Sequence, residues 1–373
     1  MTTMRIAFLM LIGCSFIFLS SCPVLPDEDI LPVFADNVIV ISDDIIVDTT
    51  WLANKVYYIN SAIEVYEALT IPAGTVVKFG ASGKLAVSGS ITAAGEAAKI
   101  IRFTSIHDDA FGGDSILNDG TGAPQNGDWY GIHLRQGSGT NSFIYCDFAY
   151  AGKEKYAALD IYGKTSVDNC AFHNNLGGNP HAANEYAALD ARICEAGTVI
   201  TNNVFYTNLW PLTLPVHQSI NSTNYFSFNH DENVATPDLI NSHQGIMLWY
   251  RDQIEINDDN TSGIVNWANT GVPLCVFDND NSEGKIVVEG SGDLQIDPGV
   301  IIKFYGPDAQ IYLAVDSDYT FSDTAIFTSY RDDTKGGDTN ADGTASTAAD
   351  DWFGIFDVDL DSYRSLNVFY ALH

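Results

Sequence analysis

Along most of the chain, apolar residues gather in short runs that are separated by Gly, Pro, Asn and Asp. The runs are rich in Val, Ile, Phe and Tyr, as in "LTIPAGTVVKF" at residues 69–79. Such runs, broken by turn-forming residues, predict short β-strands. After the first 22 residues, no long stretch keeps an apolar period of 3.6 residues, so the pattern predicts little helix.

One of these patterns occurs twice. Residues 69–79 match "LQIDPGVIIKF" at 294–304, and the match continues through "RFTSIHDD" against "IFTSYRDD", "GGD" against "GGD", and "GDWYGI" against "DDWFGI". Phe79 pairs with Phe304 and Trp129 with Trp352, and the spacing between the copies changes by only two residues over that distance. This regularity predicts one structural unit that has been duplicated.

A shorter period lies between the two copies. "YAALD" occurs at 156–160 and at 186–190, and each copy is followed by an Asn-rich phrase. Phe148, Phe172, Phe205 and Phe226 each close a similar short strand, at spacings of 24, 33 and 21 residues. Units of this size predict stacked β-coils, because no single coil could bury its apolar face alone.

The Asn-rich phrases "DNCAFHNN" and "TNNVFYTN", the Pro-Gly turn before "VIIKF" and the string FTS…DD…GGD…DW-GI resemble bacterial right-handed parallel β-helix proteins of the pectate-lyase-like class. The resemblance runs from about Asn37 to the end. It implies an all-β, right-handed parallel β-helix, a solenoid whose coils stack about 4.8 Å apart and whose asparagines bond along the turns. We expect the first module and its following coils at residues 37–262, and a second, truncated module at 263–373.

The N-terminus carries a targeting pattern. Arg5 precedes an apolar run at residues 6–19, small residues and Cys22, which predicts a signal peptide at 1–21 rather than a membrane-spanning helix. "LSSC" at 19–22 resembles the bacterial lipobox, which implies lipidation of Cys22 and makes residues 22–36 an anchor and tether. An ordinary cleaved signal with an unrelated cysteine is the alternative.

The residues after Cys22 bear on location. Pro23 rather than Asp at this position resembles outer-membrane sorting, and the acidic residues at 27–29 resemble surface-export signals. We expect an outer-membrane lipoprotein at the cell surface or on the periplasmic face, and the leaflet stays open.

The charge narrows the range of partners. The formal net charge is −31, with 48 acidic and 17 basic residues. This charge argues against nucleic acid and against electrostatic attraction to anionic lipid, and it favours divalent cations and neutral or cationic ligands. Cys146 and Cys170, 24 residues apart, are expected to stack in the core as free thiols, and a disulfide between them is the alternative.

The second copy of the repeated phrase contains half of a calcium motif. Its Asp-x-Asn-x-Asp-Gly spacing matches the first half of an oxygen-ligand calcium loop, but the twelfth position is Ala349, where such a loop needs a bidentate Glu. The candidate Ca²⁺ ligands are Asp338, Asn340 and Asp342, with Asp114, Asn118 and Asp119 as a weaker set in the first copy. The alternative is an Asp/Asn turn whose side chains bond to their own backbone.

A second candidate site comes from the YAALD repeats. Asp160 and Asp190 occupy equivalent places, so stacking would bring them within roughly 5 Å of each other. Such a pair titrates with one raised pKa or binds a cation. Arg192 follows on the same strand face, where a lyase would keep a basic group. The alternative is two solvated turn aspartates with a partner arginine.

We therefore expect a membrane-anchored, extracytoplasmic platform for binding or adhesion, directed at carbohydrate or another surface component. One alternative is a polysaccharide lyase or glycoside hydrolase that uses Asp160, Asp190 and Arg192. Another is a structural surface component that assembles through an uncapped C-terminal coil. The histidines show no recurrent metal spacing and suggest no site.

Overall fold

The computed structural model describes residues 34–117, 122–178, 185–229, 245–249, 255–256, 264–277, 285–290, 292–340 and 346–373. Cys22 and the signal peptide predicted at 1–21 lie outside these residues, as does the predicted module boundary at 262–263. The described chain is nearly all β, and its one short 3₁₀ helix, η1, spans Lys153–Lys155. Within this part of the chain there is no helix of the length and apolarity that a membrane crossing requires.

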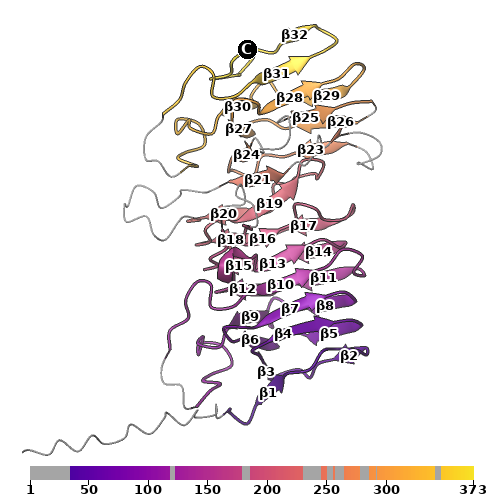
Figure 1. Ribbon diagram of the computed structural model, residues 1–373, viewed down its shortest axis with the longest axis vertical. Coiled ribbons are helices and arrows are strands. Elements are labelled where there is room, and N and C mark those ends of the chain that lie inside the picture. Colours follow the sequence, from indigo (N-terminus) through magenta and orange to yellow (C-terminus); the bar gives the residue numbers. More distant parts are fainter. Residues whose placement is uncertain are drawn as a thin grey trace, which may run out of the picture.

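Three long sheets run along the N-terminal two thirds of the molecule (Figure 1). The eight-stranded sheet contains β1 (Val38–Ile41), β3 (Val56–Ile59), β6 (Val76–Phe79), β9 (Ile101–Ser105), β12 (Cys146–Ala149), β15 (Ala171–His173), β18 (Val204–Tyr206) and β20 (Tyr225–Ser227). The six-stranded sheet contains β2 (Thr49–Thr50), β5 (Ala68–Pro72), β8 (Ser90–Ala94), β11 (Asn141–Ile144), β14 (Thr165–Asp168) and β17 (Val199–Thr201).

The ten-stranded sheet continues into the C-terminal part. It contains β4 (Ala62–Val65), β7 (Lys84–Val87), β10 (Gly131–Leu134), β13 (Leu159–Ile161), β16 (Leu189–Asp190), β19 (Leu212–Pro215), β21 (Ile246–Trp249), β24 (Leu274–Phe277), β27 (Ile301–Tyr305) and β30 (Ile326–Ser329). There it is joined by a five-stranded sheet of β22 (Glu255–Ile256), β25 (Lys285–Val288), β28 (Gln310–Leu313), β31 (Gly354–Asp357) and β32 (Ser362–Tyr363), and by a three-stranded sheet of β23 (Val265–Trp267), β26 (Asp293–Ile296) and β29 (Asp318–Phe321).

The chain visits the sheets in a fixed cycle. From β5 to β19 it passes from the six-stranded to the eight-stranded to the ten-stranded sheet, five times in succession. Every pairing between these strands is parallel and in register, and only β31 and β32 pair antiparallel among the described strands. This all-β architecture of long parallel sheets is compatible with a β-helix solenoid.

The interior is built from equivalent residues of successive coils. Phe148, Phe172, Phe205 and Phe226 occupy one register position and stack with ring centroids 4.7–5.1 Å apart and nearly parallel planes. The sequence spacing of these phenylalanines therefore predicted their alignment correctly. Cys146 and Cys170 also stack in the core, as buried free thiols, and the Cys146 amide donates to Cys170 Sγ at 3.4 Å.

Buried asparagines link the turns, as the Asn-rich phrases predicted. Asn175 Nδ2 donates to Asn208 Oδ1 at 2.9 Å, and Asn208 Nδ2 donates to Asn229 Oδ1 at 3.0 Å. Each of these three amides also donates to a main-chain carbonyl of an earlier coil. Because all three side chains are buried, the ladder satisfies polar groups that would otherwise be costly.

The two copies of the repeated module use different sheets. In the first copy, "VVKF" is β6 and "RFTS" is β9, both in the eight-stranded sheet. In the second copy, the equivalent strands β27 and β30 belong to the ten-stranded sheet. The second copy is therefore displaced by one sheet relative to the first.

Candidate functional site

A buried lysine holds the repeated acidic phrase in each module. Lys78 Nζ donates to the carbonyl of Gly113 at 2.6 Å, and Lys303 Nζ donates to the carbonyl of Gly337 at 2.5 Å. Both lysines are fully buried. The two glycines of each "GGD" have φ between +69° and +82°, a region that favours glycine, which explains why the pair is repeated.

The aspartates of the phrases make matched structural contacts. Thr104 donates to Asp108 at 2.6 Å, and in the second copy Thr328 donates to Asp332 at 2.7 Å. The serine that follows each threonine donates in the same way to the aspartate before the tryptophan, in the pairs Ser105–Asp128 and Ser329–Asp351. Two of the acidic positions that the copies share therefore close the loop onto its own module.

The paired tryptophans are packing residues. Trp129 stacks on Phe79 with centroids 4.0 Å apart, and Trp352 stacks on Phe304 at 4.1 Å. Both indoles are fully buried, so neither offers a surface to a ligand.

The calcium hypothesis stays a prediction. Asn118, Asp119 and Asp342 lie outside the described residues, Asp114 is exposed, and Asp338 and Asn340 are half-buried. Within the described ranges, no group of three or more His, Cys, Asp or Glu side chains is placed to hold a metal ion. Burial lowers the pKa of Lys303, whereas the charges of Asp332, Asp333 and Asp338 oppose that shift. The buried Lys303 ammonium group and these three carboxylates therefore attract one another.

A second group of polar residues lies on the outer side of the ten-stranded sheet. His133, Asp160, Asp190 and Thr213 occupy one register position on β10, β13, β16 and β19. Their neighbours along each strand, such as Leu159 and Leu189, lie in the core. Because side chains alternate along a strand, the column points outward.

The structure brings Asp160, Asp190 and Arg192 together, but it buries them. Asp160 and Asp190 are register partners, which confirms that the YAALD repeats align them. Arg192 donates to both carboxylate oxygens of Asp190, from Nε at 2.8 Å and from an Nη at 2.6 Å. The Asp190 side chain is 0% exposed, so this is a closed ion pair and not an open pair of reactive groups.

Arg192 also lies between two aromatic rings. Its guanidinium carbon is 4.8 Å from the Tyr186 ring centroid and 4.5 Å from that of Trp249. Burial lowers its pKa, but the charge and hydrogen bonds of Asp190 more than offset this, so the pKa of Arg192 is raised. The arginine therefore stays charged, and its contacts hold it and the Asp190 carboxylate in place.

His133 is the residue that sequence reasoning missed. Its Nδ1 lies 2.6 Å from Asp160 Oδ2, and its side chain is 27% exposed. His133 is therefore a partly exposed member of the column that contacts the buried Asp160. Burial raises the pKa of Asp160, Asp190 raises it further, and His133 opposes the shift. Only an alignment of "GIHL" with "ALDI" could have pointed to His133, and those phrases share little beyond their apolar residues.

One partly exposed tyrosine contacts this histidine, and three others form a chain of ring contacts that reaches Arg192 through Tyr186. Tyr156 and Tyr186 stack with centroids 6.0 Å apart, Tyr130 meets Tyr156 edge-on at 5.5 Å, and Tyr162 packs against the His133 ring at 5.1 Å. Burial raises the pKa of Tyr162 to about 12, so its hydroxyl stays protonated. We call these four tyrosines together with His133, Asp160, Asp190 and Arg192 the His133 face.

Beyond Thr213, the column on the outer side of the same sheet stays buried. The next residues of the column are Met247 and Cys275, and they join a buried cluster with Trp210, Phe277 and Tyr330. The Tyr330 hydroxyl donates to the carbonyl of Thr339, which fastens the second acidic phrase over this region. The column then continues to the buried Lys303 and Thr328, so its partly exposed polar residues, such as His133, lie in the N-terminal half of the sheet.

A separate titratable cluster lies on the eight-stranded sheet. Asp147 pairs with Arg102 and with His173, whose Nε2 is 2.9 Å from Asp147 Oδ1. Burial lowers the pKa of His173, but the hydrogen bond and charge of Asp147 outweigh it and raise the pKa above the ordinary value. The cluster is mostly buried and tightly paired, which favours a structural role.

Comparison with known proteins adds no relative, since no protein-family model, no curated protein and no solved structure matches the chain.

The lysine clamp makes a testable prediction. Lys303→Met keeps the bulk of the side chain but leaves Asp332, Asp333 and Asp338 without their internal cation, so residues 330–340 should open. We expect amide hydrogen exchange there to rise at least about tenfold. Lys78→Met is the matched control and should affect residues 108–115 instead. Unchanged exchange in both variants would refute the clamp.

The His173 cluster predicts a pH dependence. Because the folded chain raises the pKa of His173, its stabilisation is complete below the unfolded value of about 6.5 and is lost as pH rises through the folded value. His173→Gln should therefore lower the free energy of unfolding at pH 5.5 by on the order of 1 kcal/mol more than at pH 9. Urea unfolding at both pH values measures this, and an equal loss at both would contradict it.

Proposed function

We propose that this protein is a lipid-anchored, extracytoplasmic right-handed β-helix that binds a neutral glycan on its His133 face. Lipidation of Cys22 would place it at the outer membrane, with residues 22–36 as the tether. The observation that carries the binding proposal is a group of partly exposed tyrosines in contact with one another, with His133 and with Arg192, beside the buried carboxylate of Asp160.

The arrangement suits a sugar chain for three reasons. Tyrosine rings offer flat apolar surfaces for the C–H faces of sugars, and their hydroxyls supply hydrogen bonds. Tyr156 is 37% exposed, and His133 adds a polar group at the centre. Because the residues are held by neighbouring strands of one sheet, binding would order few flexible groups.

The charge of the face favours a neutral ligand. Arg192 and Asp190 neutralise each other, and the ammonium groups of Lys84 and Lys153 lie over the rings of Tyr156 and Tyr130. The formal net charge of −31 would repel an anionic polymer. A neutral polysaccharide avoids this repulsion.

The experiment is a glycan array probed with the full-length chain in a detergent without a sugar head group, followed by calorimetry on the hits. Tyr156→Ala should weaken binding about tenfold, because it removes the central exposed ring. Tyr225→Ala, an equally large change at a 62% exposed tyrosine on the eight-stranded sheet, should leave affinity unchanged. A neutral-glycan signal that is indifferent to Tyr156→Ala would overturn the proposal.

The contact between His133 and Asp160 favours one alternative, a polysaccharide lyase or glycoside hydrolase. In that case the partly exposed imidazole, oriented by Asp160, would be the acid or base. The same array hits decide between the two functions. Cleavage products that disappear in His133→Gln would support the enzyme, whereas binding without cleavage supports the platform.

A further inference from the structure

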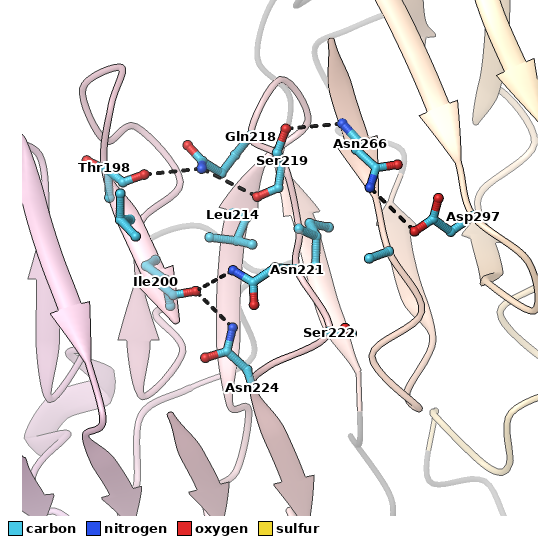
Figure 2. A pocket seen from close by; sticks show the side chains of 13 residues that line it. Thr198, Ile200, Leu214, Gln218, Ser219, Asn221, Ser222, Asn224, Asn266 and Asp297 are labelled. Carbon is cyan, nitrogen blue, oxygen red and sulfur yellow. Dashed lines mark hydrogen bonds between the residues drawn. The ribbon is translucent and has the colours of Figure 1, made fainter. Parts of the chain in front are cut away.

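A pocket of about 470 Å³ lies where the six-stranded sheet stops. Strand β17 is the last of that sheet, and the three-stranded sheet begins at β23. Ile220 bridges toward this second sheet by a single residue pair with Trp267. Figure 2 shows the pocket between these two sheet edges, with Leu214 among its lining residues.

Side-chain amides satisfy the free edge of β17 in place of a further strand. Gln218 Nε2 donates to the carbonyl of Thr198 at 3.2 Å, and Asn221 and Asn224 both donate to the carbonyl of Ile200, at 3.2 and 2.9 Å (Figure 2). An extended peptide could pair here only by displacing these amides. The pocket is therefore better suited to a small ligand than to an added strand.

The lining has the polarity of a site for a hydroxylated molecule. On one wall the Asn266 amide donates to Asp297 at 3.4 Å, and on the other lie Gln218 and the exposed hydroxyl of Ser222. The floor is apolar, formed by Ile200, Leu214, Ile220 and Ala268. Among the described lining residues, Asp297 is the one ionisable group, and none is basic.

Among these groups the Asp297 carboxylate only accepts hydrogen bonds, whereas the amides and hydroxyls can both donate and accept. Asp297 and Gln218 line a space large enough for one or two sugar rings, and the apolar floor suits the C–H faces of those rings. Two neighbouring hydroxyls can donate together to one carboxylate, and such charge-assisted hydrogen bonds are the strong ones. An anion would meet a carboxylate without a balancing cation, so anionic ligands are disfavoured.

We propose that this pocket binds a neutral mono- or disaccharide, with Asp297 accepting hydrogen bonds from two of its hydroxyl groups. The site is separate from the His133 face, because it lies between the six- and three-stranded sheets rather than on the outer side of the ten-stranded sheet. The inference therefore goes beyond the proposed function and stands without it.

The test is saturation-transfer NMR on the full-length chain with glucose, galactose, mannose, N-acetylglucosamine and their common disaccharides, followed by titration of any binder. Asp297→Ala should weaken binding at least about tenfold, the loss expected for hydrogen bonds to a charged group. Ser222→Phe places a ring at the exposed rim and should block binding without touching the core. Asp318→Ala, at an exposed aspartate of the three-stranded sheet, and Tyr156→Ala should both leave binding unchanged.

Three results would overturn the proposal. One is the absence of saturation transfer to every neutral saccharide in the panel. Another is a saccharide signal that survives both Asp297→Ala and Ser222→Phe. The third is binding of a simple organic ammonium ion, lost in Asp297→Ala, with no saccharide bound, which would make the pocket a cation site.

Discussion

The in-register stacking of parallel strands is the constraint on which the rest of this structure depends. Each strand places the same residue position directly beside its counterpart in the next coil, so one choice of residue type is repeated along the molecule. Inward positions become the phenylalanine stack, and turn positions become the asparagine ladder. Outward positions become columns of polar groups, of which His133, Asp160, Asp190 and Thr213 form one.

The same constraint explains the duplicated acidic phrase. The phrase leaves the sheet and folds back over its outer side, where a lysine from the preceding coil is buried. A buried ammonium group is costly unless carbonyls and carboxylates surround it, and the glycines and aspartates of the phrase supply those groups. Lysine and acidic loop are therefore one unit, and the unit works on either sheet because its contacts lie within the module.

The parts of the structure that repeat could be predicted from the sequence. The YAALD repeats aligned Asp160 with Asp190, and the spacing of the phenylalanines and of Cys146 and Cys170 aligned the core. The burial of Asp190 could not be predicted from the sequence, because this burial depends on how Arg192, Tyr186 and Trp249 pack. His133 was missed because its strand resembles its neighbours in polarity and not in sequence. The pocket by Asp297 lies where one sheet ends and another begins, and no local sequence pattern predicts such an interruption.

The measurement that tests the central claim most directly is hydroxyl-radical footprinting of the full-length chain, with and without the glycan that binds best. The account predicts that the bound glycan lowers modification of Tyr130, Tyr156 and Tyr186 while the exposed Tyr225 is unchanged. Full glycan occupancy with unaltered modification of Tyr156 would contradict it, and would show that the outer side of the ten-stranded sheet is not the binding surface.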